Sequence, residues 1–355
     1  MEMVYLNLSC QISDDCTASK LLARILTNRF APIRSFWARC HRLLLIQLRL
    51  FAAKSGMVGW TRHICLFLTL ILCAWAGGSQ GGLFTDGVGR QVVLDQTPRR
   101  IVALAPSITE ILYFLGLGER VVGVTQFSSY PPEAAQKPKV GSYVNLNPER
   151  IIGLSPDLVI GTADGNPPAV VRLLERVDIQ VFVLNPRNIR QVIETLVRVG
   201  ELCGVRDQAL VLADGLTRRV DAIIAKTANR AKPIVFFQVN LKPIIAANGN
   251  TFLNDLIRLA GGVNMTRDEP VTYPRIGLEA VIRGRPEVIL ISSMDRDGAF
   301  EEARQQWLNW TLIPAVKNGH VYLVDSNLTD RPSPRIVRGL EILARYIHPD
   351  AGWND

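Results

Sequence analysis

Short apolar runs of four or five residues, rich in valine and isoleucine, recur from about residue 100 toward the end of the chain. Their β-branched residues and short length favour strands over helices. Because nearly every position is apolar, both faces of each strand should be covered, as in a parallel sheet. The predicted strands are residues 100–104, 121–124, 157–160, 180–184, 234–237, 287–291 and 321–324.

Stretches with helical spacing of apolar residues lie between most of these runs. One is Ile108-x-x-Ile111-Leu112-x-x-Leu115, and another begins at residue 189. Glycines follow the first of these stretches and a further one that ends at residue 260, where they predict helix ends. Strands that alternate with helices predict an α/β fold.

One long segment breaks this alternation. Residues 207–232 contain no strand signal, and a single helix of this length would be roughly 30 Å long at about 1.5 Å per residue. Its apolar residues at helical intervals are Leu210, Leu212, Leu216, Val220, Ile223 and Ile224. We therefore predict two Rossmann-like α/β lobes joined by one long backbone helix, with a ligand cleft between the lobes. The predicted bounds are 77–205 for the N-terminal lobe, 206–232 for the linking helix and 233–355 for the C-terminal lobe.

The two predicted lobes share a sequence pattern. Glu149 is followed seven positions later by Pro156 and a buried strand, and Glu279 is followed in the same way by Pro286. Such a duplicated unit creates one cleft between two similar halves, and small ligands usually bind in clefts of this kind.

The net charge of +8 suggests a nucleic-acid or anionic-membrane partner until it is divided by region. Residues 1–56 hold eight Lys and Arg against three acidic residues, and residues 57–76 add only Arg62. Residues 77–355 therefore carry only +2, and no nucleic-acid partner is expected.

Residues 57–76 have the order of a secretory signal peptide. A short basic start at 57–63 precedes an apolar run at 64–73, and Ala74 and Ala76 supply the small residues of a cleavage site. A transmembrane anchor is the alternative, but even the 13 residues from 64 to 76 are fewer than the roughly 20 needed to span a membrane. A lipid anchor at Cys73 is not favoured, because a leucine precedes this cysteine. We therefore predict export to the periplasm.

Residues 1–56 stand in front of this complete signal. Their arginines among apolar residues could form a basic amphipathic helix on a membrane surface. The simpler interpretation is an upstream start codon, with Met57 as the true start, and we leave this segment out of the fold prediction.

Cysteine and histidine are rare after the predicted signal. Cys203 is the only cysteine beyond residue 77, which excludes an internal disulfide there, and its apolar flanks predict a packed thiol. His320 and His348 have no nearby cysteine or second histidine, so neither indicates a metal site.

Motifs of common enzyme classes are also missing from the sequence: no G-x-S-x-G, G-x-x-x-x-G-K-[ST] or H-E-x-x-H occurs. We therefore expect a binding protein with no cofactor of its own. A ligand-free surface scaffold remains a further alternative.

Several short motifs resemble one known family. They are Arg100 to Glu110, which contains Ala-Pro106-Ser107-Ile-Thr109-Glu110, then Ser129-Tyr130-Pro-Pro132, Val140-Gly-Ser-Tyr143, the Glu149 to Asp157 block, and Ser333-Pro-Arg335. Their order and spacing from about residue 97 to 349 resemble the helical-backbone class of periplasmic binding proteins. Members of that class deliver cobalamin, haem or ferric siderophores to ATP-binding-cassette (ABC) importers, and the cobalamin-binding members are the most similar.

The resemblance implies a set of ligand-binding residues. The positions that correspond to the cobalamin pocket are Tyr130, Tyr143, Thr162, Val239, Tyr273, Asn327 and Arg331. Tyr143 and Tyr273 stand where those members have tryptophan, so an aromatic face is kept. Thr162 and Val239 replace a tryptophan and a phenylalanine, which leaves the identity of the ligand open. A corrinoid is expected, with haem or a ferric siderophore as the alternative.

The resemblance also implies a partner. In similar proteins two glutamates, one on each lobe, meet arginine pockets on the importer's permease, and Glu149 and Glu279 occupy those positions. Both also fall in the first turn of a predicted helix, where a carboxylate offsets the helix dipole by about 0.3–1 kcal/mol. We expect a monomer that docks on a permease through these two residues.

Overall fold

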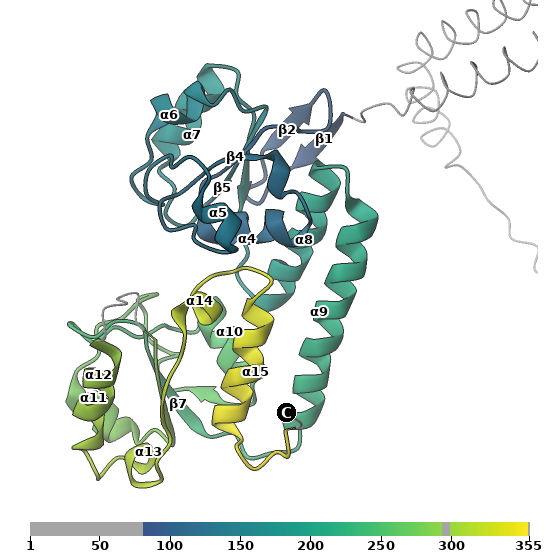
Figure 1. Cartoon of the computed structure of the whole chain (residues 1–355). Helices are drawn as coiled ribbons and strands as arrows, with labels where there is room; N and C mark the ends of the chain where they lie inside the picture. The colour runs from purple at the N-terminus through teal and green to yellow at the C-terminus, as the bar shows by residue number, and fades with distance from the viewer. Residues whose placement is uncertain (1–80, 293–298, 354–355) are drawn as a thin grey trace, which may run out of the picture. The chain divides into compact units, whose positions relative to one another are not determined.

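The structure is a computed structural model that describes residues 81–292 and 299–353 (Figure 1). The predicted extension at 1–56 and the predicted signal peptide at 57–76 lie outside the described residues. All seven predicted strands are confirmed, each within a residue or two of its expected bounds.

Four parallel strands form the sheet of the first lobe, in the order β4-β3-β5-β6. Their bounds are β3 (Ile101–Ala103), β4 (Val121–Val124), β5 (Leu158–Thr162) and β6 (Val181–Leu184). The register places Ile101 beside Leu158 and Val159 beside Val181. An antiparallel hairpin of β1 (Gly82–Thr85) and β2 (Gln91–Leu94) precedes this sheet.

Four parallel strands also form the sheet of the second lobe, in the order β8-β7-β9-β10. Their bounds are β7 (Ile234–Gln238), β8 (Val263–Asn264), β9 (Val288–Ile291) and β10 (Val321–Leu323). If β7 corresponds to β3, then β8, β9 and β10 correspond to β4, β5 and β6, and the two sheets have the same strand order. The predicted α/β class and the similarity of the two halves are confirmed.

Both faces of each sheet are buried, which explains why the strands are apolar at successive positions. In the first lobe, α6 (Pro148–Gly153) and α7 (Pro168–Arg176) cover one face, and α4 (Pro106–Phe114) and α8 (Ile189–Leu202) cover the other. In the second lobe, one face packs on α11 (Leu278–Gly284), α12 (Ala299–Leu308) and α13 (Pro314–Lys317). Its other face packs on α10 (Phe252–Leu259) and α15 (Ile336–Ile347). The remaining short elements are a 3₁₀ helix at Gly118–Arg120, α5 (Pro132–Ala135) and α14 (Ser326–Thr329).

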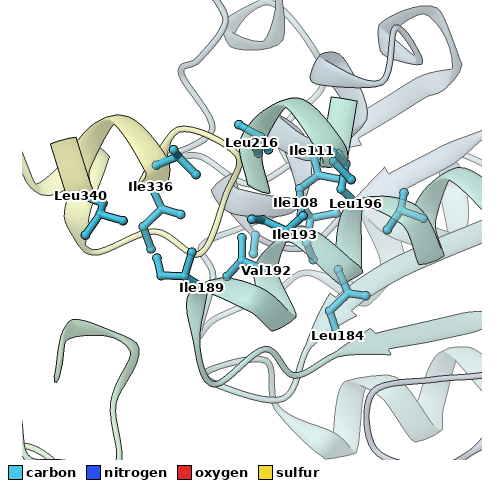
Figure 2. Close-up of a cluster of buried hydrophobic side chains, with 14 of the residues drawn as sticks. Ile108, Ile111, Leu184, Ile189, Val192, Ile193, Leu196, Leu216, Ile336 and Leu340 are labelled. Carbon is cyan, nitrogen blue, oxygen red and sulfur yellow. The ribbon is translucent and has the colours of Figure 1, made fainter. Parts of the chain in front are cut away.

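One apolar cluster includes the inner helices of both lobes. The long helix α9 (Arg206–Thr227) packs beside α8 and α15 (Figure 1). Figure 2 shows this cluster with side chains from α4, α8, α9 and α15: Ile108, Ile111, Ile189, Val192, Ile193, Leu196, Leu216, Ile336 and Leu340. The packing of Ile189 and Val192 near Ile336 gives the two lobes a common core.

Helix α9 differs in detail from its prediction. It ends at Thr227 rather than at residue 232. Leu210 and Ile224 are 39% and 36% exposed, whereas the small residues Ala209 and Ala213 are buried. The alanines allow α8 to approach closely, since Ala209 lies against Gly200 of that helix. The leucine and isoleucine that the periodicity assigned to the buried face therefore lie at its margin.

The predicted helix ends and the predicted thiol are confirmed. Gly116 has a φ of +70° and its amide donates to the carbonyl of Tyr113 at 2.9 Å, which ends α4. Gly261, with a φ of +87°, follows α10 in the same way. Cys203 is fully buried, and this burial raises the pKa of its thiol to about 12. The thiol is therefore unreactive at neutral pH.

Within residues 81–292 and 299–353, no helix combines the length and the apolar character that crossing a membrane requires.

Candidate ligand-binding site

The seven predicted ligand residues share one topological position. Each is the last residue of a parallel strand or follows one, so each lies toward the carboxyl end of a strand. Because carboxyl ends of parallel strands meet at one edge of a sheet, ligands of α/β proteins usually bind there. Tyr130 and Tyr143 follow β4, Thr162 ends β5, Val239 follows β7, Tyr273 follows β8, and Asn327 and Arg331 follow β10.

Tyr273 of the second lobe is close enough to Tyr143 of the first lobe to affect the ionisation of Tyr143. Burial, the carboxylate of Asp164 and the phenol of Tyr273 all raise the pKa of Tyr143. Burial, Asp164 and Asp330 raise the pKa of Tyr273, which Arg187 opposes. Both phenols are therefore protonated at neutral pH and can donate hydrogen bonds to a ligand. Tyr273 is thus within electrostatic range of Tyr143, and a shared role in ligand binding stays a prediction.

The position of Tyr143 is fixed by the chain that follows β5. Gly165 has a φ of +96°, and a Cβ atom at this residue would stand 2.0 Å from the Tyr143 ring, so the ring rests on the glycine. The amide of Asn166 donates to the carbonyls of Tyr143 at 2.8 Å and Leu104 at 2.9 Å. Its Oδ1 accepts from the backbone N–H of Thr162 at 2.8 Å. Asn166 thus links two predicted ligand residues, Thr162 and Tyr143, although it was not predicted itself.

An ion pair adjoins the two tyrosines. Arg187, which follows β6, donates to Asp164 at 2.9 Å, and both side chains are more than half exposed. Opposite charges this exposed contribute about 0–1 kcal/mol to stability, so their main effect here is on the field at the tyrosines.

Tyr130 lies on a loop that ends at a proline with a cis peptide bond. Its ring is partly exposed, and the guanidinium of Arg335 lies over it with Cζ 3.9 Å from the ring centroid. A cation at this distance from an aromatic face is attracted by the ring quadrupole. The pair joins the first lobe to the second.

Arg331 takes part in a buried polar cluster between the lobes. Its Nη1 donates to Oε1 of Glu110 at 3.1 Å, and its Nη2 donates to the carbonyl of Phe127 at 3.4 Å. Ser333 Oγ donates to Oε2 of the same glutamate at 2.6 Å. The sequence motifs that carried the family resemblance contained Glu110, Ser333 and Arg335, but no binding role was predicted for them.

Asp330 lies beside Arg331 and has an unusual ionisation. Burial raises its pKa to about 6, against hydrogen bonds from the hydroxyls of Thr329 and Ser292 and the charge of Arg331, which lower it. Ser292 Oγ donates to both carboxylate oxygens, at 3.1 and 3.0 Å. This carboxyl group is therefore partly protonated just below neutral pH.

Val239 and Asn327 are not joined to the other predicted residues by these contacts. Val239 packs against the core, and its N–H donates to the carbonyl of Ile245 at 2.7 Å. Asn327 donates from its side chain and its backbone to Asp325, at 2.7 and 2.9 Å, at the start of α14. Ligand contact by all seven residues, these two included, remains a prediction.

Glu149 and Glu279 are exposed and occupy the second position of α6 and of α11. Each helix precedes the corresponding strand of its lobe, β5 or β9. This placement agrees with the duplication in the sequence, and docking on a permease remains a prediction.

A separate hollow of about 520 Å³ lies in the second lobe, between the loop after β7 and helices α11 and α12. Trp307, Trp310 and Ile244 contribute to its walls, and the described residues that line it include none of the seven predicted ones. This hollow lies within the second lobe, whereas the predicted ligand positions belong to both lobes. In the described part of the chain, no group of three or more His, Cys, Asp or Glu could hold a metal ion.

Two similar α/β lobes, with aromatic and charged side chains converging from both, define a two-lobed binding protein. The chain belongs to the periplasmic binding protein family, whose sequence profile matches residues 101–328. That match begins at β3 and ends in α14, so it includes strands of both sheets.

Individual relatives narrow the comparison. The chain is 30% identical over 243 residues to a vitamin B12-binding protein of Vibrio parahaemolyticus, and this alignment covers 68% of this chain and 86% of the relative. It is similar to the crystal structure of the periplasmic vitamin B12 binding protein BtuF of Vibrio cholerae, with a TM-score of 0.65, 27% identity and coverage of 72% and 99%. It is also similar to the periplasmic heme-binding protein RhuT from Roseiflexus sp. RS-1, with a TM-score of 0.64, 25% identity and coverage of 71% and 99%.

Proposed function

We propose that this protein is an exported substrate-binding protein that captures a corrinoid of the cobalamin type and delivers it to an ABC importer. The observation that carries the proposal is that tyrosines of both lobes face the interlobe contacts: the phenol of Tyr273 lies within electrostatic range of Tyr143, and Tyr130 of the first lobe lies under Arg335 of the second. Three tyrosines offer aromatic faces and hydroxyl donors to a wide ring with polar substituents. The vitamin B12-binding relatives support the same ligand class.

Further parts of the proposal concern the protein's place in transport. It works as a monomer in the periplasm after cleavage behind Ala76, without a lipid on Cys73. It has no enzymatic activity and no resident cofactor, and it docks on the permease through Glu149 and Glu279. N-terminal sequencing and mass measurement of the exported protein test the cleavage site, and a chain that retains residues 1–56 contradicts it.

Haem is the second candidate ligand. The similarity to a heme-binding protein favours it, and so do the tyrosine phenols of the site, which could ligate ferric iron after losing their protons. The raised pKa values of Tyr143 and Tyr273 oppose that loss. A corrinoid, whose cobalt needs no phenolate from the protein, fits protonated tyrosines better.

The deciding experiment is a calorimetric titration of the exported protein with cyanocobalamin, cobinamide and hemin. We expect cyanocobalamin to bind more tightly than hemin. If hemin binds at least about tenfold more tightly than either corrinoid, a difference of about 1.4 kcal/mol, the order of candidates is wrong. If none of the three binds, the proposed ligand class is wrong.

The tyrosine pair gives a sharper form of this test. Tyr143→Ala and Tyr273→Ala should each weaken cyanocobalamin binding by roughly 1.5–3 kcal/mol, the burial that an aromatic side chain provides. Phe114→Ala is the matched control, because Phe114 is a similarly exposed aromatic residue at the end of α4. An affinity that neither tyrosine change affects would contradict the site.

A further inference from the structure

Glu110 is a charged group in an apolar position. It lies in the middle of α4, between Thr109 and Ile111, and its side chain is 2% exposed. An ionised carboxylate at this depth is costly unless cationic or hydrogen-bonding partners surround it. The identity of those partners indicates what this residue does.

Among the described residues, the side chains that donate to the Glu110 carboxylate come from the other lobe. Arg331 and Arg335 reach Oε1 at 3.1 and 3.5 Å, and Ser333 reaches Oε2 at 2.6 Å. More than 220 residues separate them from Glu110 along the chain. One carboxylate of the first lobe therefore accepts hydrogen bonds from three residues of the segment that follows β10 in the second lobe.

The same two arginines also contact the loop after β4 in the first lobe. Arg335 lies over the ring of Tyr130, and Arg331 donates to the carbonyl of Phe127. The same loop is held from α4 by Thr109, whose hydroxyl donates to Ser128 at 3.0 Å. Adjacent residues of one helix thus hold the loop, Thr109 directly and Glu110 through the other lobe.

We propose that Glu110 is a positioning residue whose buried carboxylate holds Arg331 and Arg335 so that the second lobe stays against the Phe127–Tyr130 loop with a guanidinium over Tyr130. The carboxylate does not touch the ligand. It sets the distance between the lobes at this contact and the orientation of Tyr130. The apolar cluster that includes α8 and α15 joins the two lobes elsewhere.

Two substitutions test this role. Glu110→Gln keeps the shape of the side chain and removes its charge, so the two guanidinium groups lose their common anion. Arg335→Gln leaves Glu110 paired with Arg331 and removes the cation from Tyr130. Glu201→Gln is the control, because it removes an exposed ion pair with Arg206 that lies within the first lobe.

The first measurement is hydrogen exchange of the unliganded protein, which is independent of the ligand. In Glu110→Gln and in Arg335→Gln, the amides of residues 127–130 should exchange at least about tenfold faster than in the original protein, while those of β5 and β6 keep their protection. Uniformly faster exchange in all strands would show a merely structural role and overturn the proposal.

The second measurement is affinity for cyanocobalamin, which rests on the proposed function. Each single change should weaken binding about tenfold, and the double change should be no worse than either alone, because both act through the same contact. Additive losses, or affinities within twofold of the original, overturn the proposal. If the unchanged protein binds no corrinoid, the proposed function fails, whereas the exchange experiment still decides the role of Glu110. If Glu110→Gln does not fold, Arg335→Gln decides it alone, since this side chain is 25% exposed.

Discussion

The two lobes have the same strand order and repeat one local pattern, but they contribute differently to the site. In both, a tyrosine stands six residues before the repeated glutamate, and a buried leucine or isoleucine lies midway between them: Tyr143, Leu146 and Glu149, then Tyr273, Ile276 and Glu279. The charged residues that join the lobes do not repeat, since Glu110 belongs to the first lobe and Arg331 and Arg335 to the second.

This difference shows how a duplicated fold acquires a site. The sheet and its covering helices are fixed by apolar patterning, which both halves keep. The loops at the carboxyl ends of the strands differ between the lobes, so the two lobes contribute different kinds of residue. The first lobe supplies supports with little freedom, such as Gly165 beneath Tyr143. The second lobe supplies long charged side chains that reach across.

The support beneath Tyr143 is where a substitution should have the largest effect. Gly165→Ala forces a left-handed backbone on alanine, which costs about 1–2 kcal/mol. Its Cβ would also meet the Tyr143 ring at 2.0 Å, so the ring must leave its present position. We expect a loss of roughly 3 kcal/mol in the free energy of unfolding and weaker cyanocobalamin binding.

The hairpin of the first lobe offers the matched control. Gly89 has a similar φ of +84°, but a Cβ atom there would meet nothing within 4 Å. Gly89→Ala should therefore show only the backbone cost and leave ligand binding unchanged. Urea unfolding of both variants measures the cost of the backbone strain, and calorimetric titration shows whether displacement of the Tyr143 ring weakens ligand binding. Equal effects of the two substitutions would contradict the role of Gly165.

Asp330 of the second lobe should show the next largest effect. Its pKa is raised from 3.8 to about 6, so the folded protein binds this proton more tightly than the unfolded chain. The protonated form is favoured by folding, and stability from this group is gained as the pH falls from about 6 to 4 and is absent above. Two pKa units correspond to roughly 3 kcal/mol at most.

Asp330→Asn tests this sign. At pH 7.5 the variant should be more stable than the original protein by roughly 1–3 kcal/mol, and the stability gained between pH 6 and 4 should shrink. Asp164→Asn is the control, since Asp164 is an exposed carboxylate near the same tyrosines. Urea unfolding over this pH range provides the measurement. A variant that is less stable at pH 7.5 would show that the hydrogen bonds from Ser292 and Thr329 need the charge.

The sequence predicted the scaffold well because apolar runs and helical spacing depend on local chemistry. The seven strands with apolar residues at successive positions were found, but β8, with two residues, and the β1–β2 hairpin, with alternating exposure, were not. The tyrosines were found through resemblance to a family. Glu110 and Arg335 could not be assigned, because each acts through a partner in the other lobe. Asn166 could not be assigned because its amide joins three separate segments, at Leu104, Tyr143 and Thr162. Contacts at such separations leave no periodic signal in one sequence.

The two repeated glutamates should give the smallest effects on stability, and these effects should differ between the lobes. In the first lobe Asn147 caps α6, since its side chain accepts from the N–H of Arg150 at 2.8 Å. In the second lobe no side chain caps α11, and Glu279 Oε2 lies against Gly277 at its start. Glu279 is therefore placed to offset its helix dipole. Glu149 should contribute less to its helix, because Asn147 already caps that helix.

Single and double substitutions separate this local role from docking. Glu279→Ala should lower the free energy of unfolding by about 0.3–1 kcal/mol, and Glu149→Ala by less. Neither should change cyanocobalamin affinity. If both residues also meet permease arginines, the double change should slow uptake in cells and weaken permease binding, because charges at an interface chiefly set orientation and association rate. Glu133→Ala is the control, as another exposed glutamate in the first turn of a short helix, α5. Permease binding that survives the double change would leave these residues a helix-start role only, and equal stability losses in the two lobes would contradict the difference between Asn147 and Gly277.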